Sequence, residues 1–191
     1  MRIGLLGGTF NPVHNGHLLL AEGAKQVLKL DQVLWIPARQ APHKAEVKGF
    51  ASPRDRAIMV ELAIRDHPDF KLSRIELERP PPSYTIDTIR QLQAQVKGRS
   101  VHWYFLIGSD TARELPSWRE FGQLVKKLKF MAIPRPGHTS GVLPEGVREI
   151  PVKTVDISSS EIRQRIREGQ SIRSFVPEAV CRYIEERRLY R

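Results

Sequence analysis

Residues 1–20, MRIGLLGGTFNPVHNGHLLL, contain a short apolar run, a pair of glycines and the beginning of a helix. The run over residues 3–6 suits a buried parallel strand, and Gly7 and Gly8 after it let the backbone turn sharply and approach a ligand closely. From His17 onward, apolar residues recur at helical spacing, namely Leu18, Leu20, Ala21, Ala24, Val27 and Leu28. Because a helix N-terminus presents free N–H groups to an anion, this order of strand, turn and helix predicts a phosphate site.

His14 and His17 lie three residues apart where that helix begins, so both rings can point into the same mouth. Two imidazoles can donate hydrogen bonds to phosphate oxygens and stabilise charge that develops in a transition state. A capped helix with incidental histidines accounts for the same pair, whereas zinc is disfavoured because no third ligand falls at a usable spacing. By themselves, the two histidines leave both a phosphate site and a plain helix start open.

The composition is that of a globular protein with a strong positive charge. The chain has 191 residues, 40% of them hydrophobic, and a formal net charge of +10, which suits nucleic acid, an anionic membrane or small polyanionic substrates equally. Cys181 is the only cysteine, so an internal disulfide is excluded and a reducing, cytoplasmic location is expected. The sequence shows neither a signal peptide nor a run of about 20 apolar residues that would span a membrane.

Strands and helices alternate along the rest of the chain. A second strand is expected over Asp31–Pro37, and together with the first strand and helix it predicts a parallel sheet. Further strands are expected over 70–78, 101–107, from 130 and over 148–155, and helices over 53–66, from 85, up to about 129, from 158 and over 175–190. The pattern predicts one domain, 1–191, of the α/β class: a doubly wound, Rossmann-like parallel sheet with helices on both faces and a small C-terminal helical segment.

Several polar residues lie where ligands of such a sheet bind, beyond the carboxyl ends of the strands. Each also has a purely structural explanation. Lys44 suits a solvated loop, Asp110 a helix N-cap and Trp118 the core, while Ser158 and Glu161 form the pattern of a capping box. The pattern of residues alone therefore leaves their roles open.

The strings that contain these residues resemble a known family. GGTFNPVHNGH (7–17) resembles the signature of nucleotidyltransferases with an H-x-G-H motif, a superfamily that includes the class I aminoacyl-tRNA synthetases. The GGTF start, HK (43–44), PSYTIDT (82–88), GSD (108–110), Trp118 and SSSEIR (158–163) are similar to strings of bacterial nicotinate-nucleotide adenylyltransferases. The resemblance implies adenylyl transfer from ATP to nicotinate mononucleotide in NAD biosynthesis, with pyrophosphate as the second product.

The resemblance also implies a set of site residues. The catalytic residues that it implies are His14, His17, Lys44 and Arg163. The implied ATP-binding residues are Gly7, Gly8, Thr9, Phe10, His14, His17, Gly108, Asp110, Arg135, Ser158, Ser159, Ser160 and Arg163. Those implied for nicotinate mononucleotide are Asn11, Lys44, Tyr84, Thr85, Trp118 and Arg119. Mg²⁺ is expected to arrive with ATP rather than in a metal site of the protein.

Two rival interpretations stay open beside this one. Another small transferase of the superfamily, such as phosphopantetheine adenylyltransferase, would share the ATP site. A basic RNA-binding module that keeps the fold without chemistry would share the charge, although the chain carries no aromatic-rich RNA motif. The resemblance instead implies small-molecule substrates, no nucleic acid and no membrane, in a monomer or a homo-oligomer.

Overall fold

The computed structural model describes residues 1–40, 49–134 and 141–191. Within them, six parallel strands form one sheet in the order β3-β2-β1-β4-β5-β6. The strands are β1 (Arg2–Gly8), β2 (Gln32–Pro37), β3 (Phe70–Leu72), β4 (His102–Gly108), β5 (Lys129–Ile133) and β6 (Val147–Glu149). The chain builds outward from β1 in one direction and then returns to build outward from β4 in the other, so the switch point lies between β1 and β4. This confirms the predicted doubly wound α/β fold.

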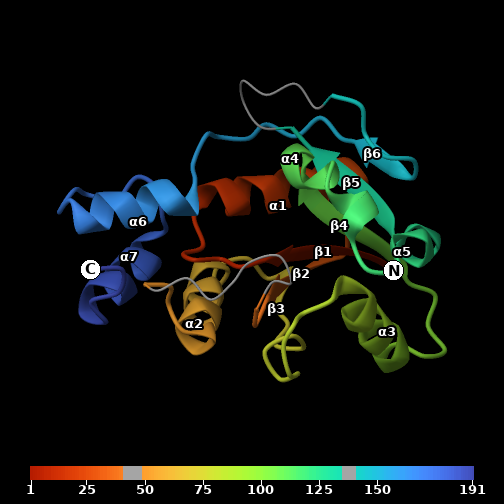
Figure 1. Ribbon diagram of the computed structural model, residues 1–191, viewed down its shortest axis with the longest axis horizontal. Coiled ribbons are helices and arrows are strands. Elements are labelled where there is room, and N and C mark those ends of the chain that lie inside the picture. Colours follow the sequence, from red (N-terminus) through yellow and green to blue (C-terminus); the bar gives the residue numbers. More distant parts are fainter. Residues whose placement is uncertain (41–48, 135–140) are drawn as a thin grey trace.

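Helices cover both faces of the sheet (Figure 1). They are α1 (Asn15–Leu28), α2 (Pro53–Ala63), α3 (Thr85–Gln95), α4 (Ser109–Ala112), α5 (Phe121–Lys127), α6 (Ser159–Arg167) and α7 (Glu178–Glu186), with a 3-10 turn, η1, at Leu115–Ser117. Successive side chains of a strand point to opposite faces, so Leu6 packs with α1 and α2 while Leu5 packs with α3 and α5. The two cores hold the ends of β1 and β4 in place beneath the site.

The C-terminal helices α6 and α7 lie at the opposite end of the molecule from α5 (Figure 1). Val180 and Ile184 of α7 are buried in the same core as α1 and α2, and Cys181 is buried beside them. The Tyr183 hydroxyl donates to Asp55 Oδ1 of α2 at 2.8 Å. The small C-terminal helical segment is therefore packed against the domain, next to the elements that carry the first motif.

Two strands are shorter than expected. The strand expected over 70–78 ends at Leu72, because residues 74–78 turn back on themselves: the N–H groups of Leu77 and Glu78 both donate to the Arg74 carbonyl. The strand expected over 148–155 is Val147–Glu149, after which Val152 packs against Gly23 of α1. A local turn ends the first of these strands, and packing against α1 follows the end of the second. Among the described residues, no helix has the length and apolar character needed to cross a membrane.

Candidate active site

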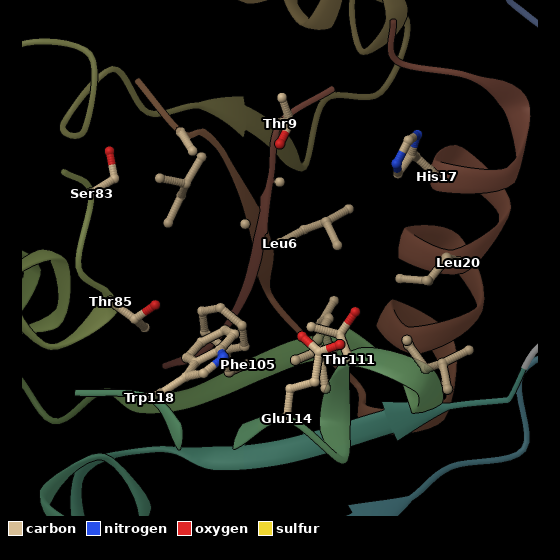
Figure 2. A pocket seen from close by; sticks show the side chains of 18 of the residues that line it. Leu6, Thr9, His17, Leu20, Ser83, Thr85, Phe105, Thr111, Glu114 and Trp118 are labelled. Carbon is tan, nitrogen blue, oxygen red and sulfur yellow. The ribbon is translucent and has the colours of Figure 1, made fainter. Parts of the chain in front are cut away.

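A cleft of about 520 Å³ opens at the carboxyl ends of β1, β2 and β4, where the switch point predicts a ligand site. Figure 2 shows His17 of α1 on one side of it, Thr85 and Trp118 on the other, and Leu6 and Thr9 of the first strand and its loop between them. Gly7 and Gly8 lie on its floor, as the sequence predicts.

The two histidines stack at the first turn of α1, with ring centroids 3.7 Å apart. His14 precedes the helix and is buried, whereas His17 reaches further into the cleft. The backbone N–H of His14 donates to His17 Nδ1 at 3.2 Å. Since Nδ1 accepts that bond, the neutral His17 ring carries its hydrogen on Nε2, which makes Nε2 a donor. This is the polarity needed to bind an anion at the helix start.

Residues 9–12, which we call the phosphate loop, are held by two arginines from distant elements. Arg56 of α2 donates to Thr9 O at 2.6 Å and to Arg39 O at 3.0 Å. Arg163 of α6 donates to Asn11 O at 2.7 Å and lies over the Phe50 ring. Burial lowers the pKa of both guanidinium groups. The loop carbonyls are thereby turned toward the arginines, away from the side where an anion would bind.

The three serines of the string SSSEIR (158–163) form hydrogen bonds at the phosphate loop and at the start of α6. Ser158 accepts a hydrogen bond from the Glu161 N–H at 3.1 Å and so caps α6. The Glu161 carboxylate accepts from Arg165 Nε at 3.2 Å, so the described residues show one half of the predicted capping box. The Ser159 hydroxyl donates to Pro12 O at 2.8 Å, and Ser160 Oγ accepts from Arg163 at 3.1 Å. The structure thus joins SSSEIR (158–163) to GGTFNPVHNGH (7–17). The serines and Arg163 lie behind the phosphate loop and do not line the cleft.

Phe10 and Asn11 are buried and do not line the cleft. The Phe10 ring packs edge-on against His17, with centroids 5.0 Å apart. Asn11 Oδ1 accepts from the Ala51 N–H at 3.0 Å and from the Tyr190 hydroxyl at 2.8 Å. The buried side chains of these two loop residues therefore anchor the phosphate loop to α1, to Ala51 and to Tyr190.

The far wall of the cleft is formed by the start of α3 and the turn after η1. Tyr84 precedes α3 and Thr85 begins it, so the free N–H groups of that helix face the cleft. Trp118 packs its indole edge-on to Phe105, with centroids 5.7 Å apart, and also lines the cleft. The Arg119 guanidinium lies 4.8 Å from the centre of the Tyr84 ring. An aromatic wall beside free N–H groups suits a flat ring that carries a negative charge.

Sequence reasoning missed Glu76, which is 8% exposed at the back of this wall. The Thr88 hydroxyl donates to Glu76 Oε1 at 2.7 Å, and Arg79 donates to Thr88 Oγ1 at 3.0 Å and to Tyr84 O at 3.2 Å. Burial raises the pKa of the Glu76 carboxyl, opposed only in part by the Thr88 hydrogen bond and by Arg79. This buried network holds the backbone that leads into α3.

The third corner of the cleft is the end of β4. Gly108 precedes the short helix α4, so Asp110 lies in its first turn and is not the N-cap. A methyl group built on Gly108 would meet no atom within 4 Å, which leaves open space at the strand end. Thr111 and Glu114 point into the cleft here (Figure 2). Asp110 is partly exposed, and its Oδ1 atom lies 3.8 Å from a terminal guanidinium nitrogen of Arg113.

Two predicted residues, Lys44 and Arg135, lie outside the described residues. Over residues 1–40, 49–134 and 141–191, no three His, Cys, Asp or Glu side chains gather closely enough to hold a metal ion. The cleft has three corners, at α1, α3 and α4. The predicted residues that line it are Gly7, Gly8, Thr9, His14, His17, Tyr84, Thr85, Gly108, Trp118 and Arg119. Those that lie outside its lining are Phe10, Asn11, Asp110, Ser158, Ser159, Ser160 and Arg163.

Comparison with known proteins gives one consistent family. Residues 5–165 match the family described as cytidylyltransferase-like. A protein of Synechococcus sp. (strain JA-3-3Ab), named probable nicotinate-nucleotide adenylyltransferase, is 45% identical over 198 residues, which cover 99% of this chain and 94% of the relative. A protein of the same name from Thermus thermophilus is 44% identical over 191 residues, 100% of both chains. The structure of Plasmodium falciparum nicotinic acid mononucleotide adenylyltransferase complexed with NaAD shares the fold, with a TM-score of 0.81, 20% identity and coverage of 99% and 97%.

Proposed function

The chain belongs to the nicotinate-nucleotide adenylyltransferases of the cytidylyltransferase-like family, and from this premise we propose the roles of its cleft in adenylyl transfer from ATP to nicotinate mononucleotide. The products are nicotinate adenine dinucleotide and pyrophosphate, in NAD biosynthesis. The observation that carries the proposal is the stacked pair His14 and His17 at the start of α1, facing a wall of Trp118 and the α3 N-terminus across a single cleft.

In the proposed reaction, a phosphate oxygen of nicotinate mononucleotide attacks the α-phosphorus of ATP. The new P–O bond forms as the bond to the β-phosphate breaks, and pyrophosphate leaves with the electron pair. A phosphate dianion is already a nucleophile, so the protein needs no general base. Its contribution comes from positioning the two phosphates and from stabilising the charge that develops between them.

We propose that the corner of the cleft at α1, which we call the phosphate corner, stabilises that charge. His17 Nε2 donates to the reacting phosphate, His14 and the α1 N-terminus bind its neighbours, and Gly7 and Gly8 let the chain approach them. Arg163 adds positive charge from behind the phosphate loop, where its hydrogen bond to Asn11 O supports it. We keep Lys44 as a further phosphate ligand. Mg²⁺ that arrives with ATP would supply charge neutralisation at the phosphates, as a partner of the substrate and not of a carboxylate site of the protein.

The other two corners bind the rest of the substrates. We assign the pyridine ring to Trp118, because an indole face suits the electron-poor pyridinium ring. We place its carboxylate at the N–H groups around Thr85 and near Arg119, because a helix N-terminus suits an anion. Gly108 and Asp110 are assigned to the ATP ribose, since the carboxylate accepts hydrogen bonds from sugar hydroxyls and the glycine leaves room. A free thiol at Cys181 and the use of ATP support a cytoplasmic location.

The deciding experiment measures pyrophosphate release with Mg-ATP and one of three acceptors at equal concentration: nicotinate mononucleotide, its amide, and phosphopantetheine. We expect the acid to react fastest. Activity with phosphopantetheine alone would keep the phosphate corner and overturn the roles of Thr85 and Trp118. Failure of all three acceptors, together with salt-sensitive RNA binding, would overturn the proposal in favour of a binding module.

A further inference from the structure

The penultimate residue of the chain reaches the phosphate loop. Tyr190 is 7% exposed, and its hydroxyl donates to Asn11 Oδ1 at 2.8 Å across a separation of 179 residues. The only other bond to that oxygen comes from the Ala51 N–H at 3.0 Å, among the described residues. Because a backbone N–H can only donate, it identifies the accepting atom as the oxygen of the amide. Two donors from different parts of the chain thus orient the Asn11 side chain.

The backbone bends to place this ring. Arg188 and Tyr190 have φ values of 50° and 69°, in the left-handed region that large side chains rarely adopt. At Arg188 this conformation belongs to the end of α7, where the N–H groups of Arg188 and Leu189 donate to the carbonyls of Glu185 and Ile184. At Tyr190 it accompanies a ring that is buried and bonded to Asn11. Residues 187–190 therefore turn back toward the domain after α7 and bring the Tyr190 hydroxyl to the Asn11 side chain.

The surroundings keep the Tyr190 hydroxyl protonated. Burial raises the pKa of the Tyr190 hydroxyl, and Asp55 adds to the rise, while the positive charges of Arg163 and Arg56 oppose it. These are the two arginines that donate to the carbonyls of Asn11 and Thr9. The hydroxyl stays a donor over the neutral pH range, and it lies among the groups that hold the loop.

We propose that Tyr190 is a positioning residue for the transfer reaction, which holds Asn11 and through it the phosphate loop and His14 in the geometry that the reacting phosphates require. This rests on the proposed function. The hydroxyl acts through Asn11 and not on the substrate, because Asn11 and Tyr190 are both buried outside the lining of the cleft. A displacement of the loop by a fraction of an ångström would alter how the phosphates align.

Helix α7 supplies a matched control. The Tyr183 hydroxyl also donates a 2.8 Å bond, to Asp55 Oδ1, but Tyr183 has no hydrogen bond to the phosphate loop among the described residues. Tyr190→Phe and Tyr183→Phe each remove one hydroxyl and keep the ring. Loss of such a bond should lower the melting temperature of either variant by about 1–6 °C. Only Tyr190→Phe should change the chemistry.

The test compares kcat and KM for both substrates in the two variants and the wild type. We expect Tyr190→Phe to lower kcat about tenfold with KM for nicotinate mononucleotide within about twofold, the pattern of lost transition-state alignment. Tyr183→Phe should keep the wild-type kcat. In an Asn11→Ala background, Tyr190→Phe should cause no further loss. A wild-type kcat in Tyr190→Phe, or an equal loss in Tyr183→Phe, would overturn the proposal.

Hydrogen exchange separates this proposal from the function on which it rests. Peptides covering residues 9–17 should exchange faster in Tyr190→Phe than in the wild type. In Tyr183→Phe, the same peptides should exchange at the wild-type rate. If the wild type releases no pyrophosphate with nicotinate mononucleotide, the proposed function fails while the exchange result still tests the support of the loop. Unchanged exchange in Tyr190→Phe would overturn the positioning role even in an active enzyme.

Discussion

Replacing Arg56 by lysine tests how firmly the phosphate loop is held. Arg56 is 3% exposed, and its planar group donates to two carbonyls at once, Thr9 O at 2.6 Å and Arg39 O at 3.0 Å. These carbonyls belong to the segments that follow β1 and β2, so one side chain joins two neighbouring loops of the site. A lysine ammonium is a single point of charge on an unbranched stem and can serve one of them.

The size of the effect follows from the bond that is lost. A hydrogen bond to a charged group contributes about 1.5–3 kcal/mol, and the lysine leaves one of the two carbonyls without this partner. For a chain of this length, about 2–4 °C of melting temperature corresponds to 1 kcal/mol. Arg56→Lys should therefore melt about 3–12 °C below the wild type. Its urea midpoint should fall while the m-value stays unchanged, because the folded state remains compact.

Arg74→Lys is the matched control. Arg74 also donates through a guanidinium, to Glu61 Oε2 at 3.0 Å, but both side chains are about half exposed, at 46% and 61%. An exposed pair contributes about 0–1 kcal/mol, so this variant should melt within about 4 °C of the wild type. The reasoning is refuted if Arg56→Lys is as stable as the wild type, or if the two lysine variants lose the same amount.

Four further variants test the packing, the charge and the assigned roles. A methyl group on Gly23 would lie 2.4 Å from Val152 Cγ1, so Gly23→Ala should destabilise by about 1–3 kcal/mol in thermal unfolding. Val152→Ala in the same chain should restore part of that loss, and no recovery would contradict the contact. Burial raises the pKa of Glu76 above its ordinary 4.5, so at pH values between the two pKa values the folded state binds more protons than the unfolded state. The stability of the wild type therefore falls as the pH rises from about 4.5 through the raised pKa of the folded state. The melting temperature of Glu76→Gln relative to the wild type should therefore increase from pH 4 to pH 7, whereas a constant difference would count against the shift. His17→Ala should keep its circular dichroism and lose on the order of 10²-fold or more in kcat, and wild-type turnover would remove it from the mechanism. Trp118→Ala should raise KM for nicotinate mononucleotide and spare ATP, and an equal effect on both would make it scaffold.

Much of the fold can be predicted from the order of residues because it depends on local patterns. An apolar run bounded by glycine, as at residues 3–8, is typical of a buried strand. The helical spacing after His17 indicates a helix with one apolar face that packs against the sheet. Helical crossovers between such strands make the sheet parallel, and a parallel sheet brings the loops after β1, β2 and β4 to one edge. The place of the cleft follows from these rules.

The limits of the elements were less predictable, since contacts with distant residues decide them. The segment 73–78 has strand character, yet it leaves the sheet after Leu72 so that Glu76 can be buried against Thr88. The strand expected to run to Val155 ends at Glu149, and Val152 instead occupies the space beside Gly23 of α1. Periodicity reports which residues are apolar and at what spacing, and it carries no information on which partner covers them.

The sequence by itself therefore determined the sheet, the family and the location of the histidine pair, all of which are written in contiguous strings. Only the tertiary structure decided what holds those histidines. Arg56, Arg163 and Tyr190 meet the phosphate loop from 47, 152 and 179 residues away, and each does so through a backbone carbonyl or a buried amide oxygen. Every residue has a backbone carbonyl, so no pattern of side chains marks the two that the arginines meet. The Asn11 side chain is visible in the sequence, but its distant partner is not.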